Sequence, residues 1–148
     1  SGCEGLVGAD VMTTTLPKFG ESAEDFFADF DTTFNDREWL LIRCGTTEEE
    51  QLVRFFVNWA LKETYLKATG IGLGIELTRI EFDIDTEVVA RARSAHRTLL
   101  PGAATVKIDG RPMAGWSFEL GFLDDFHVFA VGVGPFSQEY GKSGEWPH

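Results

Sequence analysis

The stretch that decides the fold runs from residue 55 to residue 70 and reads FFVNWALKETYLKATG. Apolar residues recur in it at helical spacing, and Gly70 is a typical helix C-cap. Thr47 and the three glutamates after it are typical of a helix start, so we predict one long helix over 48–69. Because apolar side chains occur on nearly all of its faces, we expect this helix to be central and buried on both sides.

The least ordinary residue of the predicted helix is Glu63. At about 100° per residue, it lies within a wedge roughly 80° wide whose other members are apolar: Leu52, Phe56, Trp59 and Leu66. Burying an unpaired carboxylate is costly. We therefore expect Glu63 to have a cation, a proton or an opening to solvent.

Composition limits the classes of protein to consider. A length of 148 residues with 43% hydrophobic and 25% charged content suits one globular domain. The net charge of −11 argues against a nucleic-acid partner, which needs clustered basic residues. There is no apolar run of about 20 residues and no charged-then-apolar leader. We therefore expect a cytoplasmic protein without a membrane span, whose two cysteines are reduced.

The rest of the chain indicates an α+β fold. We predict a mostly antiparallel, three- to four-stranded sheet packed against the central helix and two shorter helices near 22–34 and 36–43. A short helix also fits within 86–100. Residues 1–134 form the predicted domain and 135–148 a loosely ordered tail. The predicted strands, of which the last three form a meander, are 5–12, 77–84, 105–108, 116–120 and 127–133.

A second acid, Asp10, stands near the end of the first predicted strand. Gly8, two residues earlier, suggests a close backbone approach there. Asp10 and Glu63 make an oxygen pair of the kind that Mg²⁺ takes from proteins, and Lys67 would face a phosphate bound by the metal. A buried Glu63–Lys67 ion pair, four residues apart on the helix, is an equally weighted alternative from the residues alone.

Two segments resemble the signature motifs of the 4′-phosphopantetheinyl transferase superfamily. Residues 8–10 match Gly-x-Asp, and residues 59–68 match Trp-x-x-Lys-Glu-x-x-x-Lys-Ala. The eukaryotic branch is matched further by the glycine-rich segment 70–77 and the Trp-x-Phe-Glu segment 116–119. The resemblance covers residues 5–133.

The resemblance implies a reaction and a set of site residues. Family members transfer the phosphopantetheine arm of coenzyme A to a serine of an apo acyl or peptidyl carrier protein and release 3′,5′-ADP. Asp10 and Glu63 would be the Mg²⁺ ligands, and Glu63 would also help to deprotonate the serine. Lys67 would bind phosphate. Lys62 would contribute to the cofactor site, mainly through positioning or packing.

The resemblance leaves the architecture open. Large family members have two similar halves, and this chain resembles the C-terminal half of such a pseudo-twofold fold, with an apolar surface where the other half would lie. Met12 stands where many bacterial members have a third acidic ligand. The alternatives are a compact holo-carrier-protein synthase acting as a homotrimer and a non-catalytic carrier-protein-binding module. The carrier could belong to a fatty-acid, polyketide, peptide or lysine pathway.

Overall fold

The central helix of the computed structural model, α3, runs from Glu48 to Thr69 as the sequence predicts. The Thr47 hydroxyl accepts a hydrogen bond from the Glu50 amide at 3.1 Å and begins the helix. Gly70 ends it in the left-handed conformation, with φ +70°, which glycine adopts without steric cost. The structure describes residues 5–70 and 75–135, so the glycine-rich segment 71–74 and the predicted tail beyond 135 lie outside it.

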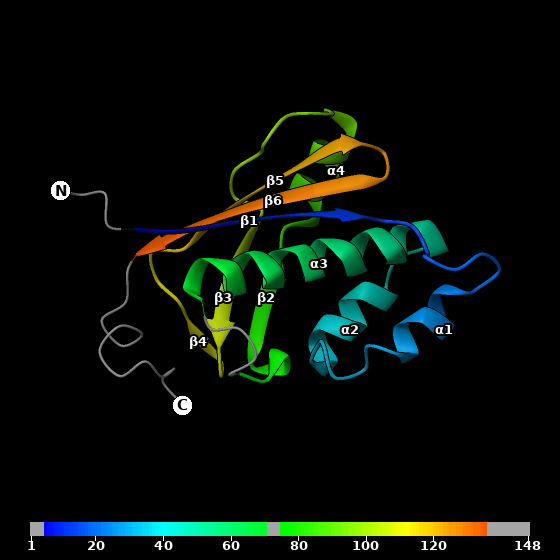
Figure 1. The fold of residues 1–148 in the computed structure, drawn as a ribbon, viewed down its shortest axis with the longest axis horizontal. Helices are drawn as coiled ribbons and strands as arrows, with labels where there is room; N and C mark the ends of the chain where they lie inside the picture. Colours follow the sequence, from blue (N-terminus) through cyan, green and yellow to red (C-terminus); the bar gives the residue numbers. More distant parts are fainter. Residues whose placement is uncertain (1–4, 71–74, 136–148) are drawn as a thin grey trace.

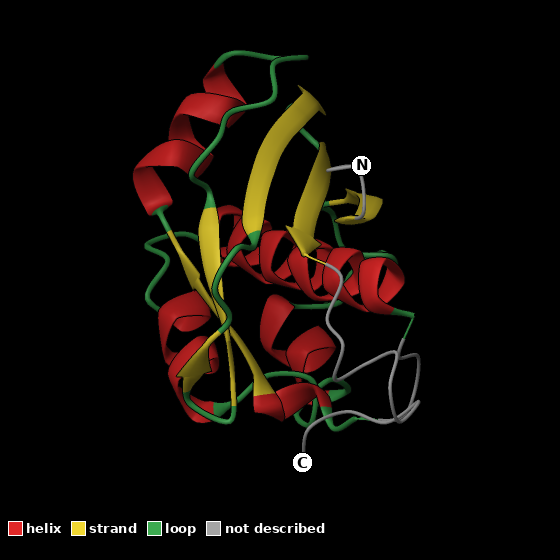
Figure 2. Ribbon diagram, turned by 90° about the vertical axis from the view of Figure 1, so that its left-hand side faces the viewer, coloured by secondary structure: helices red, strands yellow, loops and turns green. Residues whose placement is uncertain are grey.

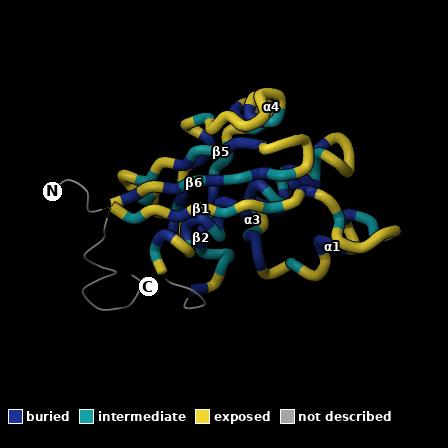
Figure 3. Tube along the Cα trace, turned by 45° about the horizontal axis from the view of Figure 1, so that its top comes forward, coloured by how far each residue is buried: buried dark blue, intermediate teal, exposed yellow. Residues whose placement is uncertain are grey.

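The first sheet covers one side of α3. It is antiparallel, with strand order β1-β6-β5, and consists of β1 (Gly5–Thr13), β6 (His127–Pro135) and β5 (Ser117–Asp124). β1 lies alongside α3 and runs in the opposite direction (Figure 1). β1 is buried on one face only, since its outward-facing Val7 and Val11 are 65% and 58% exposed. Only alternate residues of β1 face the core (Figure 3).

The second sheet packs against another side of α3. Its antiparallel strands are β2 (Ile80–Ile84), β3 (Ala104–Ile108) and the short β4 (Arg111–Pro112). Our single meander therefore divides between two sheets, because β3 pairs with β2 and β4, whereas β5 pairs with β6 (Figure 2). β2 also starts later than predicted, since Leu77–Arg79 forms a 3-10 turn, η1.

The α+β class is confirmed, with four α-helices among the described residues. Besides α3 these are α1 (Ala23–Ala28), α2 (Asp36–Arg43) and α4 (Thr86–Ser94), the last within the segment where a short helix fitted. α2 matches its predicted range. No helix in residues 5–70 and 75–135 is both long and apolar enough to cross a membrane.

α1 is shorter than the predicted helix over 22–34. Its Ser22 cap is present, but after Ala28 the Phe30 amide bonds to the Phe27 carbonyl and the chain turns. The turn lets Phe30 and Phe34 both contact the ring of Phe55 on α3, at centroid distances of 5.5 and 5.3 Å. Tertiary packing of the aromatic residues thus overrides their helical spacing.

An aromatic cluster joins α1, α2 and the first half of α3. Phe55 is fully buried at its centre. It contacts the rings of Phe26, Phe27, Phe30, Phe34, Trp39, Phe56 and Trp59. A second, larger core lies between α3 and the two sheets.

Phe55→Ala should destabilise the protein by about 3–5 kcal/mol, because it removes a buried ring and leaves a cavity between three helices. Urea unfolding followed by circular dichroism measures the change. Phe19→Ala is the matched control, since Phe19 is fully exposed and its loss should change stability by less than about 0.5 kcal/mol. Equal effects of the two substitutions would contradict the assigned core.

Candidate functional site

Two glycines that face each other across β1 and β6 set the distance between the first sheet and α3. Gly8 pairs with Gly132, and both face the backbone or side chain of Thr64. A Cβ on Gly8 would overlap the Thr64 carbonyl oxygen and lie 2.8 Å from the Ala68 nitrogen. A Cβ on Gly132 would lie 3.0 Å from the Thr64 methyl group. The predicted close approach at Gly8 is therefore present, and its partner is α3.

This close packing places Asp10 against α3. Asp10 follows Gly8 by two residues and so lies on the same face of β1, about 6.6 Å further along. That distance equals about four residues of a helix, and β1 and α3 run in opposite directions (Figure 1). Asp10 therefore lies beside the turn of α3 that contains Glu63.

Asp10 forms an ion pair with Lys67 of α3. The Lys67 ammonium donates to Asp10 Oδ1, and the Asp10 side chain is only 10% exposed, whereas that of Lys67 is 53% exposed. The hydrogen bond to Asp10 and the charge of Asp10 raise the pKa of Lys67, and the charge of Glu63 adds to the effect. The two predicted carboxylates, Asp10 and Glu63, thus both lie within electrostatic reach of Lys67.

Glu63 itself is half-buried rather than enclosed. Its neighbours on the same stripe of α3, Phe56, Trp59 and Leu66, are also half-buried. The carboxylate therefore has the opening to solvent that its apolar stripe requires. The alternative Glu63–Lys67 salt bridge is not formed in the described part of the chain, because Lys67 pairs with Asp10 instead.

Asp10 also has one carboxylate oxygen that its ion pair with Lys67 leaves unused. Its Oδ2 is buried and has no hydrogen-bond partner within residues 5–70 and 75–135, an arrangement that costs free energy unless a ligand satisfies the oxygen. Among the described residues no group of three or more His, Cys, Asp or Glu side chains is arranged to hold a metal. Asp10 with Glu63 supplies two carboxylates. A Mg²⁺ ion commonly takes that number from protein and fills its other positions with water and phosphate oxygens.

Lys62 lies away from this group, in the interior. Its side chain is 2% exposed, and its ammonium donates to Glu38 Oε1 at 2.8 Å, to the Thr33 carbonyl at 3.0 Å and to the Leu77 carbonyl at 2.8 Å. These three acceptors use its three donors. The structure therefore gives Lys62 a packing position and does not bring it to the side chain of Asp10.

Glu38, the partner of Lys62, is a residue whose importance we did not predict. Glu38 is completely buried. Burial raises the pKa of Glu38 and lowers the pKa of Lys62. The charge of each residue partly offsets the pKa shift of the other. Asn35 and Glu38 have the spacing of a capping box in the sequence, and the structure contains both of its hydrogen bonds. That signal predicts a helix start but gives no indication of a partner 24 residues away.

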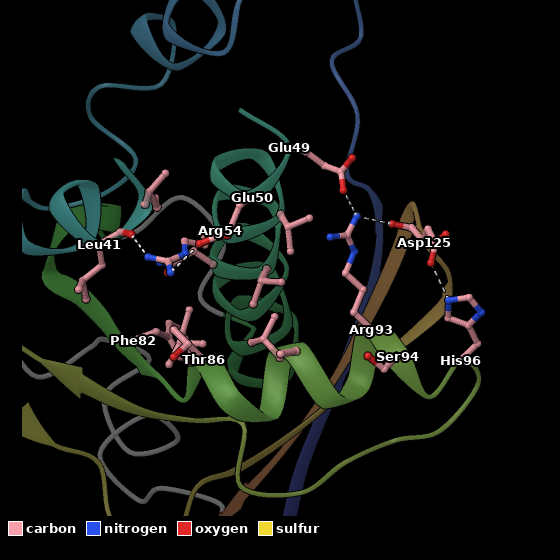
Figure 4. Close-up of a pocket in the computed structure, with 17 residues that line it drawn as sticks. Leu41, Glu49, Glu50, Arg54, Phe82, Thr86, Arg93, Ser94, His96 and Asp125 are labelled. Carbon is pink, nitrogen blue, oxygen red and sulfur yellow. Dashed lines mark hydrogen bonds and ion pairs between the residues drawn. The ribbon is translucent and has the colours of Figure 1, made fainter. Parts of the chain in front are cut away.

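A cavity of about 790 Å³ opens on another side of α3, between α2, β2 and α4 (Figure 4). Its two arginines are paired, Arg54 with Glu50 and Arg93 with Glu49. The glutamates that begin α3 therefore have structural partners. None of the four predicted site residues lines this cavity.

Comparisons with known proteins agree with the motif resemblance. The family model described as the 4′-phosphopantetheinyl transferase superfamily matches residues 6–130. The chain is 38% identical over 127 residues to the human L-aminoadipate-semialdehyde dehydrogenase-phosphopantetheinyl transferase, and 37% identical over 131 residues to a phosphopantetheinyl transferase of Thraustochytrium. These alignments cover 86% of this chain but only 39% and 41% of the relatives. The chain thus spans about two fifths of their length.

Gly8→Ala should destabilise the protein by about 1–3 kcal/mol or more, because the new methyl group overlaps backbone atoms of α3 that are unable to move independently. Thermal or urea unfolding measures the change. Gly5→Ala on the same strand is the matched control, since its Cβ would meet only the Gly134 carbonyl oxygen, at 3.2 Å. A Gly8→Ala protein as stable as Gly5→Ala would contradict the close helix–sheet contact.

Proposed function

The chain belongs to the 4′-phosphopantetheinyl transferase superfamily, and we propose that it supplies the catalytic carboxylates of an enzyme that transfers the phosphopantetheine arm of coenzyme A to a serine of an apo carrier protein. One observation supports this function above others. The contact of Gly8 with α3 holds the Asp10 carboxylate, with one unpartnered oxygen among the described residues, against Lys67, whose ammonium also lies within reach of the charge of Glu63.

Asp10 and Glu63 are the proposed ligands of a Mg²⁺ ion. Asp10 Oδ1 is engaged by Lys67, so the buried Oδ2 is the oxygen left for a cation. Glu63 adds a second carboxylate from α3. When bound, the ion would neutralise charge on the diphosphate of coenzyme A, which is the main requirement of phosphoryl transfer.

Glu63 is the proposed acceptor of the serine proton. The serine oxygen forms a bond to the phosphorus that carries the pantetheine arm. The bond from that phosphorus to the bridging oxygen breaks, and 3′,5′-ADP leaves with the electron pair. A half-buried carboxylate is suited to take the proton because it reaches both the apolar interior and the solvent-facing substrate.

Lys67 is the proposed phosphate-binding residue. Its side chain is half-exposed, and Asp10 orients the ammonium without enclosing it. A lysine in this position acts as a point charge that binds a phosphate oxygen and stabilises the charge that develops during transfer. Lys62, by contrast, contributes to the site through its buried position next to Glu63.

We propose that a second half, similar to this one, completes the cofactor site. The matched relatives are more than twice as long as their aligned part. The outer face of the first sheet exposes Val7, Val11 and Val133. Val7 pairs with Val133, and Val11 lies four residues further along β1 on the same face. An exposed apolar face of this kind is typical of an interface.

Transfer of a labelled phosphopantetheine arm from a coenzyme A analogue to an apo carrier protein tests the function. The carrier domains of an aminoadipate-semialdehyde dehydrogenase and of a fatty-acid synthase are suitable acceptors. Labelling by the intact natural polypeptide should require Mg²⁺. It should fall by at least about 100-fold in Asp10→Ala and in Glu63→Gln, because each variant removes a carboxylate that the reaction uses.

The matched control is Asp83→Ala, which removes an exposed carboxylate paired with Arg37 at the surface and should leave labelling unchanged. Labelling that survives both site substitutions would contradict the assigned roles. Carrier binding without any labelling by the wild-type protein would favour the non-catalytic module.

Sedimentation of the chain on its own tests the architecture. The proposal of a second half predicts a monomer, or an aggregate held by the exposed valines, and Val7→Ser with Val11→Ser should reduce that aggregation. A stable trimer that transfers the arm by itself would instead support the compact synthase.

A further inference from the structure

The buried pair of Glu38 and Lys62 connects four parts of the fold. Lys62 lies on α3 and donates to the carbonyl groups of Thr33, before α2, and Leu77, in η1. Glu38 Oε1 also accepts from the Asn35 amide, and Glu38 Oε2 accepts from the Phe82 amide of β2 at 3.1 Å. The pair therefore fixes the position of α3 relative to α2, η1 and β2.

A contribution to stability does not by itself explain why a buried ion pair occupies this position. The two side chains are 0% and 2% exposed, and desolvating two charges costs about as much as their attraction returns. Apolar side chains of similar size often fill such a place with equal or greater stability. A role that depends on the exact position of the Lys62 ammonium explains the pair better. The hydrogen bonds of the ammonium are directional, whereas apolar contacts are not.

Glu63 lies between two residues whose positions are fixed. On one side Lys62 is held by Glu38 and two carbonyl groups. On the other side Thr64 is completely buried against the glycines of β1 and β6. Adjacent residues of a helix point about 100° apart, so these two contacts restrain rotation of α3 about its axis at Glu63.

We propose that Glu38 is a positioning residue for the Glu63 carboxylate and acts through Lys62. The inference rests on the proposed transferase function, in which Glu63 takes the serine proton. Glu38 touches neither substrate nor metal in this assignment. Its effect is on the direction in which Glu63 points, and errors of about 1 Å in such groups reduce rates by about 100-fold.

The main test uses two variants of the intact natural polypeptide. Glu38→Asp keeps the charge but shortens the side chain, so Lys62 must shift to reach it. Glu38→Gln combined with Lys62→Met removes both charges at nearly constant volume but leaves the carbonyl groups of Thr33 and Leu77 without their donor, so its melting temperature should fall by several degrees while the protein stays folded at about 25 °C. We expect kcat to fall by about 10- to 100-fold in both variants, with KM for coenzyme A and carrier protein changed by less than about twofold.

The matched control is an exposed ion pair between α1 and α2, Glu24 with Arg43. Glu24→Gln combined with Arg43→Met should leave kcat unchanged and lower the melting temperature only slightly, because Arg43 also lies over the Trp39 ring at 4.7 Å. A folded Glu38→Gln/Lys62→Met protein with wild-type kcat would overturn the proposal, because the pair would then be structural only.

The ¹³C resonance of the Glu63 carboxyl group reports its surroundings without any reaction. We expect it to shift in Glu38→Asp and in the charge-free double variant, but not in the Glu24/Arg43 control. If the wild-type protein transfers no arm, the proposed function fails, and the resonance still decides the positioning role. An unchanged Glu63 signal in both Glu38 variants would overturn it.

Discussion

The distance between α3 and the first sheet is the constraint on which the rest of the structure depends. Gly8 and Gly132 leave only hydrogen atoms between the sheet and the helix at Thr64 and Ala68. Larger residues would push α3 outward by the thickness of a methyl group or more, because protein interiors have no spare volume. Asp10 and Lys67, which meet across this contact, would then separate.

The same helix carries two ion pairs that differ in how completely their hydrogen bonds are satisfied. Lys62 and Glu38 are buried, and each of their polar atoms has a partner. Lys67 is half-exposed and Asp10 is 10% exposed, and Asp10 Oδ2 has no partner in the part of the chain that the structure describes. A satisfied pair holds segments together, whereas an incomplete pair at the surface has capacity left for a ligand. This difference, rather than charge alone, separates a structural pair from a candidate site.

Much of the fold was predictable where local rules decide it. The bounds of α3 follow from Thr47 and Gly70, and the approach of β1 to a neighbour follows from Gly8. The division of the strands between two sheets was not predictable, because alternation with period two is the same in either sheet. The pairing of Lys62 with Glu38 was also not predictable, because Glu38 lies on another helix. The capping role of Glu38 already explains a glutamate at that position.

The glycine contact also determines how β1 aligns with β6. β1 is an edge strand with a single neighbour, and its apolar residues occur on both faces, so hydrophobic patterning specifies its alignment only weakly. A slip by one residue would bring Val7 or Ala9 under α3 and turn Asp10 towards solvent. Only the alignment with Gly8 opposite Gly132 lets the helix approach. The two glycines therefore specify the register of the edge strand, because a shift by one residue would place a larger side chain against α3 and leave the carboxylate on the wrong face.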